Sequence, residues 1–238
     1  MIKTIKLCKF FKDKKAVIDL DLEIKKGELF SLLGVNGAGK TTTIKMLSTL
    51  SNPTSGEIYI KGINLKENPN KIKEIMNISP QETAIASNLT VKENLTFIAG
   101  VYQIKNKNEK VEELLNSFNL TEMQNKKASL LSGGQKRRLS IALALVNEPE
   151  ILFLDEPTLG LDVLARRELW NTINSLKGKT TIILTTHYLE EAESLSDRIG
   201  IMYNGKLTAV GTPKELIALS GEKDFENAFV KLATGGAL

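Results

Sequence analysis

The sequence of 238 residues predicts an α/β protein built around a mostly parallel sheet. Nearly continuous apolar runs of strand length, at residues 29–33 and 151–154, are typical of strands buried on both faces of such a sheet. Segments with the apolar spacing of helices separate these runs along the chain. This alternation indicates parallel strands connected by helices that pack on the sheet.

The N-terminal part is predicted to begin with strands. Residues 18–24 alternate apolar and charged side chains, the period-two pattern of a strand with one face in water. The buried strand at 29–33 leads into a helix, whose apolar face consists of Ile44, Leu47 and Leu50. A break at 52–56 that contains Pro and Gly separates this helix from a second alternating strand, at 58–60.

The middle of the chain is predicted to be helical. Thr90 and Glu93 fit a capping box, which marks the start of one helix. Residues 111–118 have the i, i+3, i+4, i+7 spacing of a second, amphipathic helix. We expect residues 85–145 to form a helical part inserted into the α/β core. The stretch Leu-Ser-Gly-Gly-Gln, residues 131–135, lies near its C-terminal end.

Buried strands return in the C-terminal part, at 151–154 and 180–185. The helix between them has its inward positions at Leu169, Ile173 and Leu176. Asn204 and Gly205 separate two further apolar segments and predict a hairpin with a two-residue turn. Because we find no internal repeat or long linker, we expect residues 1–238 to form a single domain. Its core would consist of 1–84 and 146–238.

Composition limits the classes of function. The net charge of +4 comes from scattered lysines, so we expect no nucleic acid partner. The single cysteine, Cys8, excludes an internal disulfide and fits a small core residue. Apolar runs stay well short of the roughly 20 residues that cross a bilayer, and the N-terminus lacks a long apolar signal segment. We therefore expect a cytoplasmic protein whose membrane role would come from a partner.

The segment 34–41, Gly-Val-Asn-Gly-Ala-Gly-Lys-Thr, fits the phosphate-loop pattern G-x-x-x-x-G-K-[ST] without a mismatch. Glycines let backbone N–H groups approach phosphate oxygens, and the following helix adds its positive N-terminal end. Lys40 is expected to neutralise the β- and γ-phosphates, and the Thr41 hydroxyl to hold Mg²⁺. The flanking strand and helix favour this interpretation over a simple glycine turn. The predicted nucleotide contacts in this loop are Gly34, Asn36, Gly37, Ala38, Gly39, Lys40, Thr41 and Thr42.

Asp155 and Glu156 directly follow the predicted strand 151–154. They should therefore lie at the carboxyl end of a parallel strand, where open α/β sheets bind ligands. Asp155 is expected to bind Mg²⁺, directly or through water. Glu156 would polarise the attacking water in phosphoryl transfer, which relies on a positioned base and charge stabilisation. The alternative is a solvated acidic turn.

The phosphate loop, the stretch 131–135 and the acids 155–156, in this order, resemble the ATP-binding-cassette (ABC) ATPases over almost the whole chain. The resemblance implies a P-loop NTPase core of RecA type with a mostly parallel sheet. It further implies an antiparallel N-terminal β subdomain and an inserted helical subdomain. The Asn-Lys-x-Asp motif that reads guanine is missing from the sequence, and a P-loop kinase would leave 131–135 and His187 unexplained.

The resemblance implies roles for further residues. Phe11 matches the aromatic residue that stacks on adenine, although Phe10 is an alternative and either also fits a core residue. Gln81 matches the Q-loop residue that contacts Mg²⁺ or the attacking water. His187, the only histidine, matches the switch residue that contacts the γ-phosphate, and a metal site on a lone histidine is not expected. Asp162 fits both the D-loop and a helix cap.

A second anion site is expected where the stretch 131–135 opens a helix. In the ABC family this signature covers the γ-phosphate held by the facing subunit. The resemblance therefore implies a head-to-tail pair of ATPase subunits, identical or related, which encloses two ATP molecules. The signature residues expected to contact nucleotide are Ser132, Gly133, Gly134 and Gln135.

The chain also resembles detached ATPase subunits of bacterial ABC transporters, which implies membrane-spanning permease partners and a place on the cytoplasmic face of the cell membrane. Residues 165–170, 187–193 and 224–232 resemble the export branch, although 224–232 also fits a plain capping helix. An ABC importer subunit, or a soluble ABC ATPase acting on ribosomes or DNA, is the alternative. The cargo is not encoded in this chain, because the permease selects it.

Overall fold

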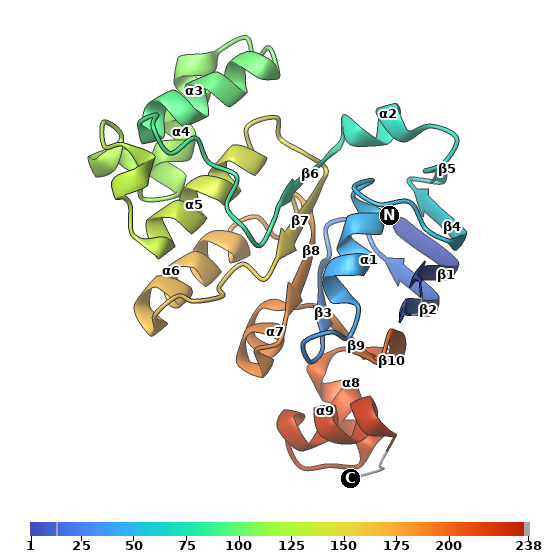
Figure 1. Ribbon diagram of the computed structural model, residues 1–238. Helices are drawn as coiled ribbons and strands as arrows, with labels where there is room; N and C mark the ends of the chain where they lie inside the picture. Colours follow the sequence, from blue (N-terminus) through green and yellow to red (C-terminus); the bar gives the residue numbers. More distant parts are fainter. Residues whose placement is uncertain (13, 236–238) are drawn as a thin grey trace.

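The computed structural model describes residues 1–12 and 14–235, and its strands form two sheets. The six-stranded sheet has the order β10 (Lys206–Gly211), β9 (Arg198–Tyr203), β3 (Leu29–Leu33), β8 (Thr181–Thr186), β7 (Ile151–Asp155), β6 (Met76–Ser79). The four-stranded sheet has the order β2 (Lys14–Ile24), β1 (Ile2–Phe11), β4 (Ser55–Ile60), β5 (Ile63–Asn64). The two sheets lie on either side of a common core (Figure 1).

The six-stranded sheet is parallel except for its β9–β10 edge pair, as predicted. Every residue of β3, β7 and β8 is buried, which explains their nearly continuous apolar sequences. Because these strands run in the same direction, their carboxyl ends meet at one edge. The register pairs Leu33 with Thr186 and Asp155 with Thr185 at that edge. The Asn204–Gly205 turn joins β9 to β10 with positive φ at both residues, as the hairpin pattern predicted.

The four-stranded sheet is antiparallel. Its β2 strand differs from the predicted alternation, since Val17 is fully buried and Ile18 is only half-buried. The cause is a register shift beside Asp19, whose φ of +45° breaks the period-two pattern. Farther along the strand, the alternation holds.

Nine α-helices occur in the described part of the chain. They are α1 (Lys40–Leu47), α2 (Pro69–Lys73), α3 (Val91–Val101), α4 (Lys107–Ser117), α5 (Gly133–Ala144), α6 (Val163–Asn174), α7 (Leu189–Leu195), α8 (Pro213–Ser220) and α9 (Phe225–Thr234). Two predicted helix positions are wrong. Leu50 lies beyond the end of α1 with 61% of its surface exposed, and Leu176 lies beyond the end of α6.

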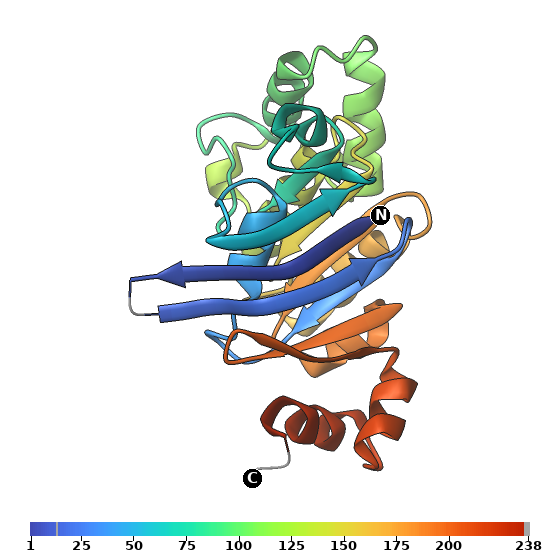
Figure 2. The same ribbon diagram turned by 90° about the vertical axis from the view of Figure 1, so that its right-hand side faces the viewer.

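Helices α3, α4 and α5 form a lobe at one end of the molecule, and α8 and α9 lie at the opposite end (Figures 1 and 2). The predicted Thr90–Glu93 capping box opens α3. Apolar residues of the lobe, such as Phe118, share one buried cluster with Leu152 and Leu154 of β7. The lobe is therefore packed directly against the sheet. Its boundaries at 85 and 145 remain a prediction.

The elements after the sheet pack on its β9–β10 side. Leu216 of α8 and Phe225 of α9 join a buried cluster with Ile199 and Ile201 of β9. Residues 225–232 are helical, and Asp224 caps α9 by accepting a hydrogen bond from Asn227 N at 2.9 Å. Among the helices of residues 1–12 and 14–235, none combines the length and apolar character needed to cross a membrane.

Candidate functional site

The loop 34–39 joins β3 to α1 at the carboxyl edge of the large sheet. Gly39 caps α1 with a φ of +104°, and a Cβ there would lie 2.4 Å from Ala16 O. A Cβ on Gly34 would lie 2.3 Å from Met202 O. Any side chain at these two positions would clash with the backbone of neighbouring strands, which explains why the loop needs glycine there.

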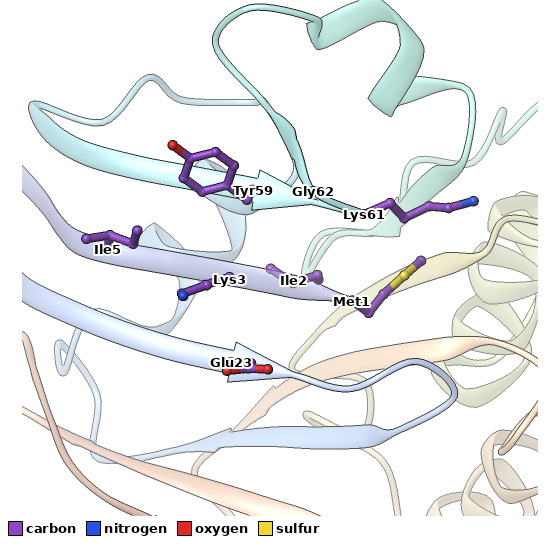
Figure 3. Close-up of a pocket in the computed structure, with 8 residues that line it drawn as sticks. All are labelled: Met1, Ile2, Lys3, Ile5, Glu23, Tyr59, Lys61 and Gly62. Atoms are coloured by element: carbon purple, nitrogen blue, oxygen red, sulfur yellow. The ribbon is translucent and has the colours of Figure 1, made fainter.

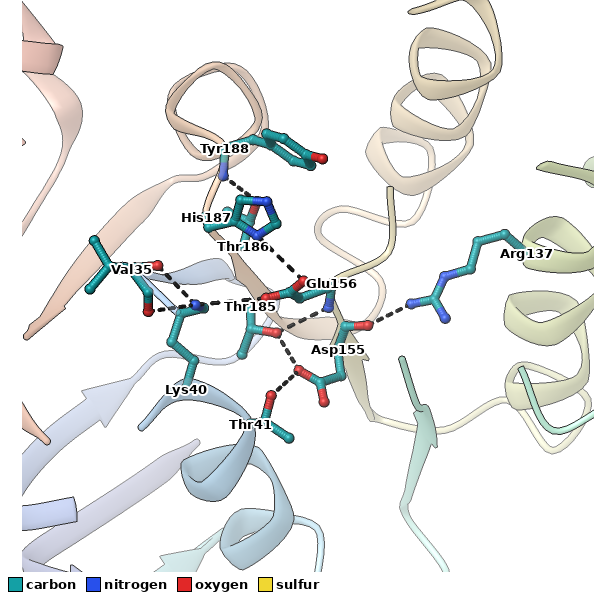
Figure 4. Close-up of polar contacts among 11 residues, drawn as sticks. Val35, Lys40, Thr41, Arg137, Asp155, Glu156, Thr185, Thr186, His187 and Tyr188 are labelled. Atoms are coloured by element: carbon teal, nitrogen blue, oxygen red, sulfur yellow. Dashed lines mark hydrogen bonds and ion pairs between the residues drawn. The ribbon is translucent and has the colours of Figure 1, made fainter. Parts of the chain in front are cut away.

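Lys40 is the first residue of α1, and its side chain folds back toward the loop 34–39. It is almost fully buried, with 4% of its surface exposed. Its Nζ donates to Gly34 O at 2.8 Å and to Val35 O at 3.2 Å, and lies 3.7 Å from Glu156 Oε1 (Figure 4). Burial lowers the pKa of Lys40, whereas the charges of Glu156 and Asp155 raise it. Burial has the larger effect, so the pKa is lowered overall, and Lys40 lies in the lining of a cavity where it could contact an anionic ligand.

Asp155 is held by two hydroxyl groups. Thr41 Oγ1 donates to Asp155 Oδ1 at 3.0 Å, and Thr185 Oγ1 donates to the same oxygen at 2.5 Å. Thr185 Oγ1 also accepts from Glu156 N at 3.0 Å. The start of α1 and the ends of β7 and β8 thus meet at one carboxylate, which is 3% exposed. Sequence reasoning missed Thr185, because its contact with Asp155 depends on strand register.

Glu156 turns its carboxylate toward both Lys40 and His187. Its Oε2 lies 3.4 Å from His187 Nδ1, a close approach without hydrogen-bond geometry. The backbone of Glu156 has a φ of +47°, in the left-handed region that a non-glycine residue seldom adopts. Hydrogen bonds from Glu156 N to both oxygens of Thr185 hold this strained conformation, at 3.1 Å to O and 3.0 Å to Oγ1.

Lys40, Glu156 and His187 open onto one cavity of about 390 Å³, whereas Asp155 lies outside its lining. Its lining residues are Lys14, Ala16, Asn36, Gly37, Ala38, Gly39, Lys40, Thr41, Thr42, Gln81, Glu156, Leu159 and His187. Most of the predicted site residues are therefore brought together, and Lys14, Ala16 and Leu159 are additions that the sequence did not indicate. A separate groove on the outer face of the antiparallel sheet, around Ile5 and Tyr59, contains none of the predicted residues (Figure 3).

Phe11 and Phe10 lie at the end of β1, outside the lining of this cavity. Phe11 is 51% exposed and Phe10 is 38% exposed, so the alternative that either is a core residue is wrong. Lys9 Nζ lies 5.0 Å from the centre of the Phe11 ring. Either ring is available to a flat ligand, and Phe11 remains the predicted partner of adenine.

The signature 131–135 opens α5 through a capping box. Ser132 Oγ accepts from Gln135 N at 3.3 Å, and Gln135 Oε1 accepts from Ser132 N at 3.0 Å. Ser132 and Gly133 are exposed, and within the described chain neither residue lines the cavity around Lys40. Asp162 caps α6, accepting from Leu164 N and Ala165 N at 3.0 Å, so its predicted capping role is confirmed.

Arg137 of α5 reaches from the signature helix to the segments that follow β6 and β7. Its guanidinium donates to Pro157 O at 2.9 Å, Pro80 O at 2.5 Å and Asp155 O at 2.8 Å. Burial lowers the pKa of Arg137 to about 10, against the opposing charges of Asp155, Glu191 and Glu156. Arg137 thus connects the signature helix to the loop that carries Gln81.

The sequence profile of the family described as "ABC transporter" matches residues 17–159, which include the phosphate loop, the signature and both acids. The chain belongs to the ABC transporter family. The predicted resemblance to ABC ATPases and the predicted fold class are both confirmed.

Similar proteins come from several organisms. The probable multidrug ABC transporter ATP-binding protein YbhF of Escherichia coli (strain K12) is 42% identical over 98% of this chain and 41% of its own length. The phospholipid-transporting ATPase ABCA3 of Homo sapiens is 41% identical over 84% of this chain and 12% of its own length. The chain thus spans well under half of these curated relatives.

Two solved structures cover most of this ABC chain. The ATP-binding subunit of an ABC transporter is 30% identical, with a TM-score of 0.87 over 98% of this chain and 99% of that one. A dimeric ATP-binding cassette in a post-hydrolysis state, bound to ADP and Pi, is 26% identical. Its TM-score is 0.80 over 89% of this chain and 98% of that one. The roles of the individual site residues in this chain remain predictions.

Proposed function

We propose that this chain is the ATP-hydrolysing subunit of an ABC transporter and that it acts as a head-to-tail dimer. The observation that carries the proposal is the composition of the cavity around Lys40. Lys40, Glu156 and His187 line it, whereas the exposed Ser132 of the same chain does not. If each nucleotide site is formed by two subunits, one subunit should supply the phosphate loop and the acids, and the other should supply the signature. The cavity around Lys40 has the residues expected from the first subunit only.

Nucleotide would bind along the loop 34–42, with Lys40 facing the β- and γ-phosphates and Phe11 facing adenine. Mg²⁺ would bind beside Thr41 and Asp155; the 3.0 Å separation of their oxygens and the preference of Mg²⁺ for oxygen ligands support this assignment. The described residues contain no group of three or more His, Cys, Asp or Glu side chains that could hold a metal. Mg²⁺ usually takes one or two carboxylates together with substrate phosphates, so two protein oxygens suffice. When bound, the ion would neutralise charge on the phosphates.

In hydrolysis, the Glu156 carboxylate would accept a hydrogen bond from the attacking water and orient it toward the γ-phosphate. Lys40 already lies 3.7 Å from Glu156 Oε1, so a phosphate that approaches Lys40 also approaches the proposed base. Gln81 would contact the water or the ion. His187, which lies beside Glu156 Oε2, would contact the γ-phosphate. This assignment uses four polar segments that line the cavity: 36–42, Gln81, Glu156 and His187.

The partner in the dimer would supply Ser132, Gly133, Gly134 and Gln135 to the γ-phosphate. Exposure of Ser132 and Gly133 at the N-terminus of α5 supports this role, because unpaired N–H groups there favour an anion. The dimeric cassette with ADP and Pi, whose fold this chain shares, also supports it. The second subunit would be an identical chain or a related one.

We further propose that the dimer powers export through separate membrane-spanning permease subunits at the cytoplasmic face of the membrane. Support comes from the names of the multidrug and phospholipid transporters that share about two fifths of their aligned residues with this chain. An importer role is the second candidate. The solved structure of cbiO1 from Clostridium perfringens, part of the ABC transporter complex cbiONQ, is 28% identical with a TM-score of 0.81. This similarity supports the proposal that the chain works together with other transporter subunits. No observation favours action on ribosomes or DNA.

Mixing two inactive variants tests the composite site. Lys40→Ala removes the phosphate-loop cation, and Gly133→Arg blocks the signature where a Cβ would meet no atom within 4 Å. A heterodimer of these variants keeps one intact pairing of loop and signature. We expect each variant alone to be inactive and the mixture to recover a substantial part of the wild-type turnover. Wild-type protein without Mg²⁺-dependent ATP hydrolysis would contradict the enzymatic proposal. An active wild type with an inactive mixture would contradict the shared site.

A further inference from the structure

Glu191 is a buried carboxylate that does not line the cavity around Lys40. Glu191 of α7 has no exposed surface, and its Oε1 accepts a hydrogen bond from Trp170 Nε1 at 3.2 Å. Within the described residues, the second carboxylate oxygen of Glu191 and the buried Thr158 hydroxyl lack a hydrogen-bond partner of good geometry. Buried polar atoms that are left in this way cost stability, so a purely structural role leaves them unexplained.

The groups around Glu191 come from three separate segments. Burial raises the pKa of Glu191, whereas contacts with the Thr186 and Thr158 hydroxyls and Trp170, and the charge of Arg166, lower it. Thr186 ends β8, Thr158 follows β7, and Arg166 and Trp170 belong to α6. Glu191 therefore lies at a junction between the two strands that carry the catalytic residues and the helix beside them.

One side of this junction leads to His187. The Arg166 guanidinium carbon lies 4.6 Å from the centre of the Tyr188 ring, and that ring lies 4.2 Å from the His187 ring. Tyr188 N donates to Thr186 Oγ1 at 2.9 Å (Figure 4). Arg166 and Thr186, which both lie near Glu191, thus also contact Tyr188, and the Tyr188 ring lies beside that of His187.

The other side of the junction leads to the segment 158–162. Thr158 is fully buried, and its carbonyl oxygen accepts from Leu161 N at 3.1 Å. The segment ends at Asp162, the cap of α6. Leu159, between them, lines the cavity. A displacement of Thr158 would therefore move a wall of the nucleotide cavity.

We propose that Glu191 is a positioning residue that holds His187 and the segment 158–162 in one arrangement, so that the two move together. The proposal rests on the proposed function, in which His187 contacts the γ-phosphate and 158–162 faces the partner subunit. Glu191 itself touches neither nucleotide nor water in this scheme. Its effect on turnover would come from the placement of His187, and small misplacements of a catalytic group reduce rates strongly.

The chain offers two natural reporters, because it contains one histidine and one tryptophan. Nuclear magnetic resonance of ring-labelled protein therefore gives one imidazole signal set, from His187, and one indole N–H signal, from Trp170. Glu191→Gln should shift both signals. Glu190→Gln, at the exposed neighbouring position, should shift neither. A shift of the Trp170 signal with an unmoved His187 signal would mean that Glu191 only packs α6 against α7, which would overturn the proposal.

Kinetics provide the second measurement. We expect Glu191→Gln to lower kcat for ATP by about tenfold, with KM and thermal midpoint close to those of Glu190→Gln. Adding Glu191→Gln to His187→Ala should cause no further loss, because both changes disable the same contact. Multiplying losses, or a normal kcat, would overturn the proposal. If Glu191→Gln does not fold, Trp170→Phe removes the indole donor to Glu191 while keeping an aromatic ring. For this variant too, a normal kcat, or losses that multiply with those of His187→Ala, would overturn the proposal. The resonance measurement needs no hydrolysis, so it separates this proposal from the proposed function.

Discussion

Arg137 Nη2 donates a 2.8 Å hydrogen bond to the carbonyl oxygen of Asp155, which joins the helix of the signature to the end of β7. The same guanidinium binds Pro80 O, one residue before Gln81. The helical lobe is thus connected to the ends of β6 and β7 by hydrogen bonds from one side chain to the backbone.

Replacing Arg137 should therefore destabilise the whole chain. Arg137→Ala removes four hydrogen bonds that a charged, buried donor makes to the carbonyl oxygens of Pro157, Pro80, Gln81 and Asp155. We expect the free energy of unfolding to fall by about 3 kcal/mol, measured by urea denaturation. The exposed Arg167→Ala is the control and should change it by no more than about 0.5 kcal/mol. Equal effects of the two variants would contradict a structural role for Arg137.

Lys40→Ala should abolish tight MgATP binding. The buried ammonium is the only lysine among the described residues that both lines the cavity and contacts the loop carbonyls. Without it, the phosphates lose their main positive partner, and isothermal calorimetry should detect a fall in affinity of about a hundredfold or more. Lys45→Ala, on the exposed face of the same helix, should bind normally. Undiminished affinity in Lys40→Ala would remove the phosphate-loop assignment.

Thr185→Val tests the hydroxyl that sequence reasoning missed. The change keeps the shape of the side chain but removes the hydrogen bonds to Asp155 Oδ1 and from Glu156 N. Of the two hydroxyl groups that hold the Asp155 carboxylate, only that of Thr41 would remain, and Glu156 would lose part of what fixes its left-handed backbone. We expect kcat to fall by about tenfold. Thr208→Val, on the exposed face of β10, serves as control and should keep wild-type turnover.

The motifs and most elements could be predicted from the sequence, because each is local. The residues that interact are close neighbours in the sequence in the phosphate loop, in the Thr90–Glu93 capping box and in the Asn204–Gly205 turn. Thr185 and Arg137 could not be found in this way. They lie 30 and 18 residues from Asp155 in the chain, and only strand register and helix packing bring them together.

Errors in the predicted elements have equally physical causes. A bulge beside Asp19 shifts the buried positions of β2, and periodicity alone does not reveal a bulge. Leu50 has the right spacing for α1, yet the helix ends at Leu47 and the chain turns through a positive φ at Thr49. An apolar spacing indicates a face, but the end of a helix depends on backbone conformation.

Glu156→Gln should separate binding from hydrolysis. The amide keeps the size of the side chain but cannot act as a base, so hydrolysis should slow by about a hundredfold or more. ATP-dependent dimers should persist, and size-exclusion chromatography with light scattering would measure them. Glu193→Gln, exposed on α7, should hydrolyse ATP normally. Normal turnover in Glu156→Gln would exclude Glu156 as the base.

The surface 81–89, which joins β6 to the helical lobe, should dock a permease helix. Glu82 is exposed there, and the native Cys8 is buried with 5% exposure, so a cysteine at position 82 is the reactive thiol of choice. In native membranes, Glu82→Cys should form crosslinks to a membrane-spanning protein. Lys107→Cys, exposed at the start of α4, tests whether such crosslinks are specific to this surface. Crosslinks from position 82 only to ribosomal or DNA-bound proteins would contradict the transport role. Membrane crosslinks from both positions would instead contradict the placement of the docking surface, because contact would then not depend on the loop that carries Gln81.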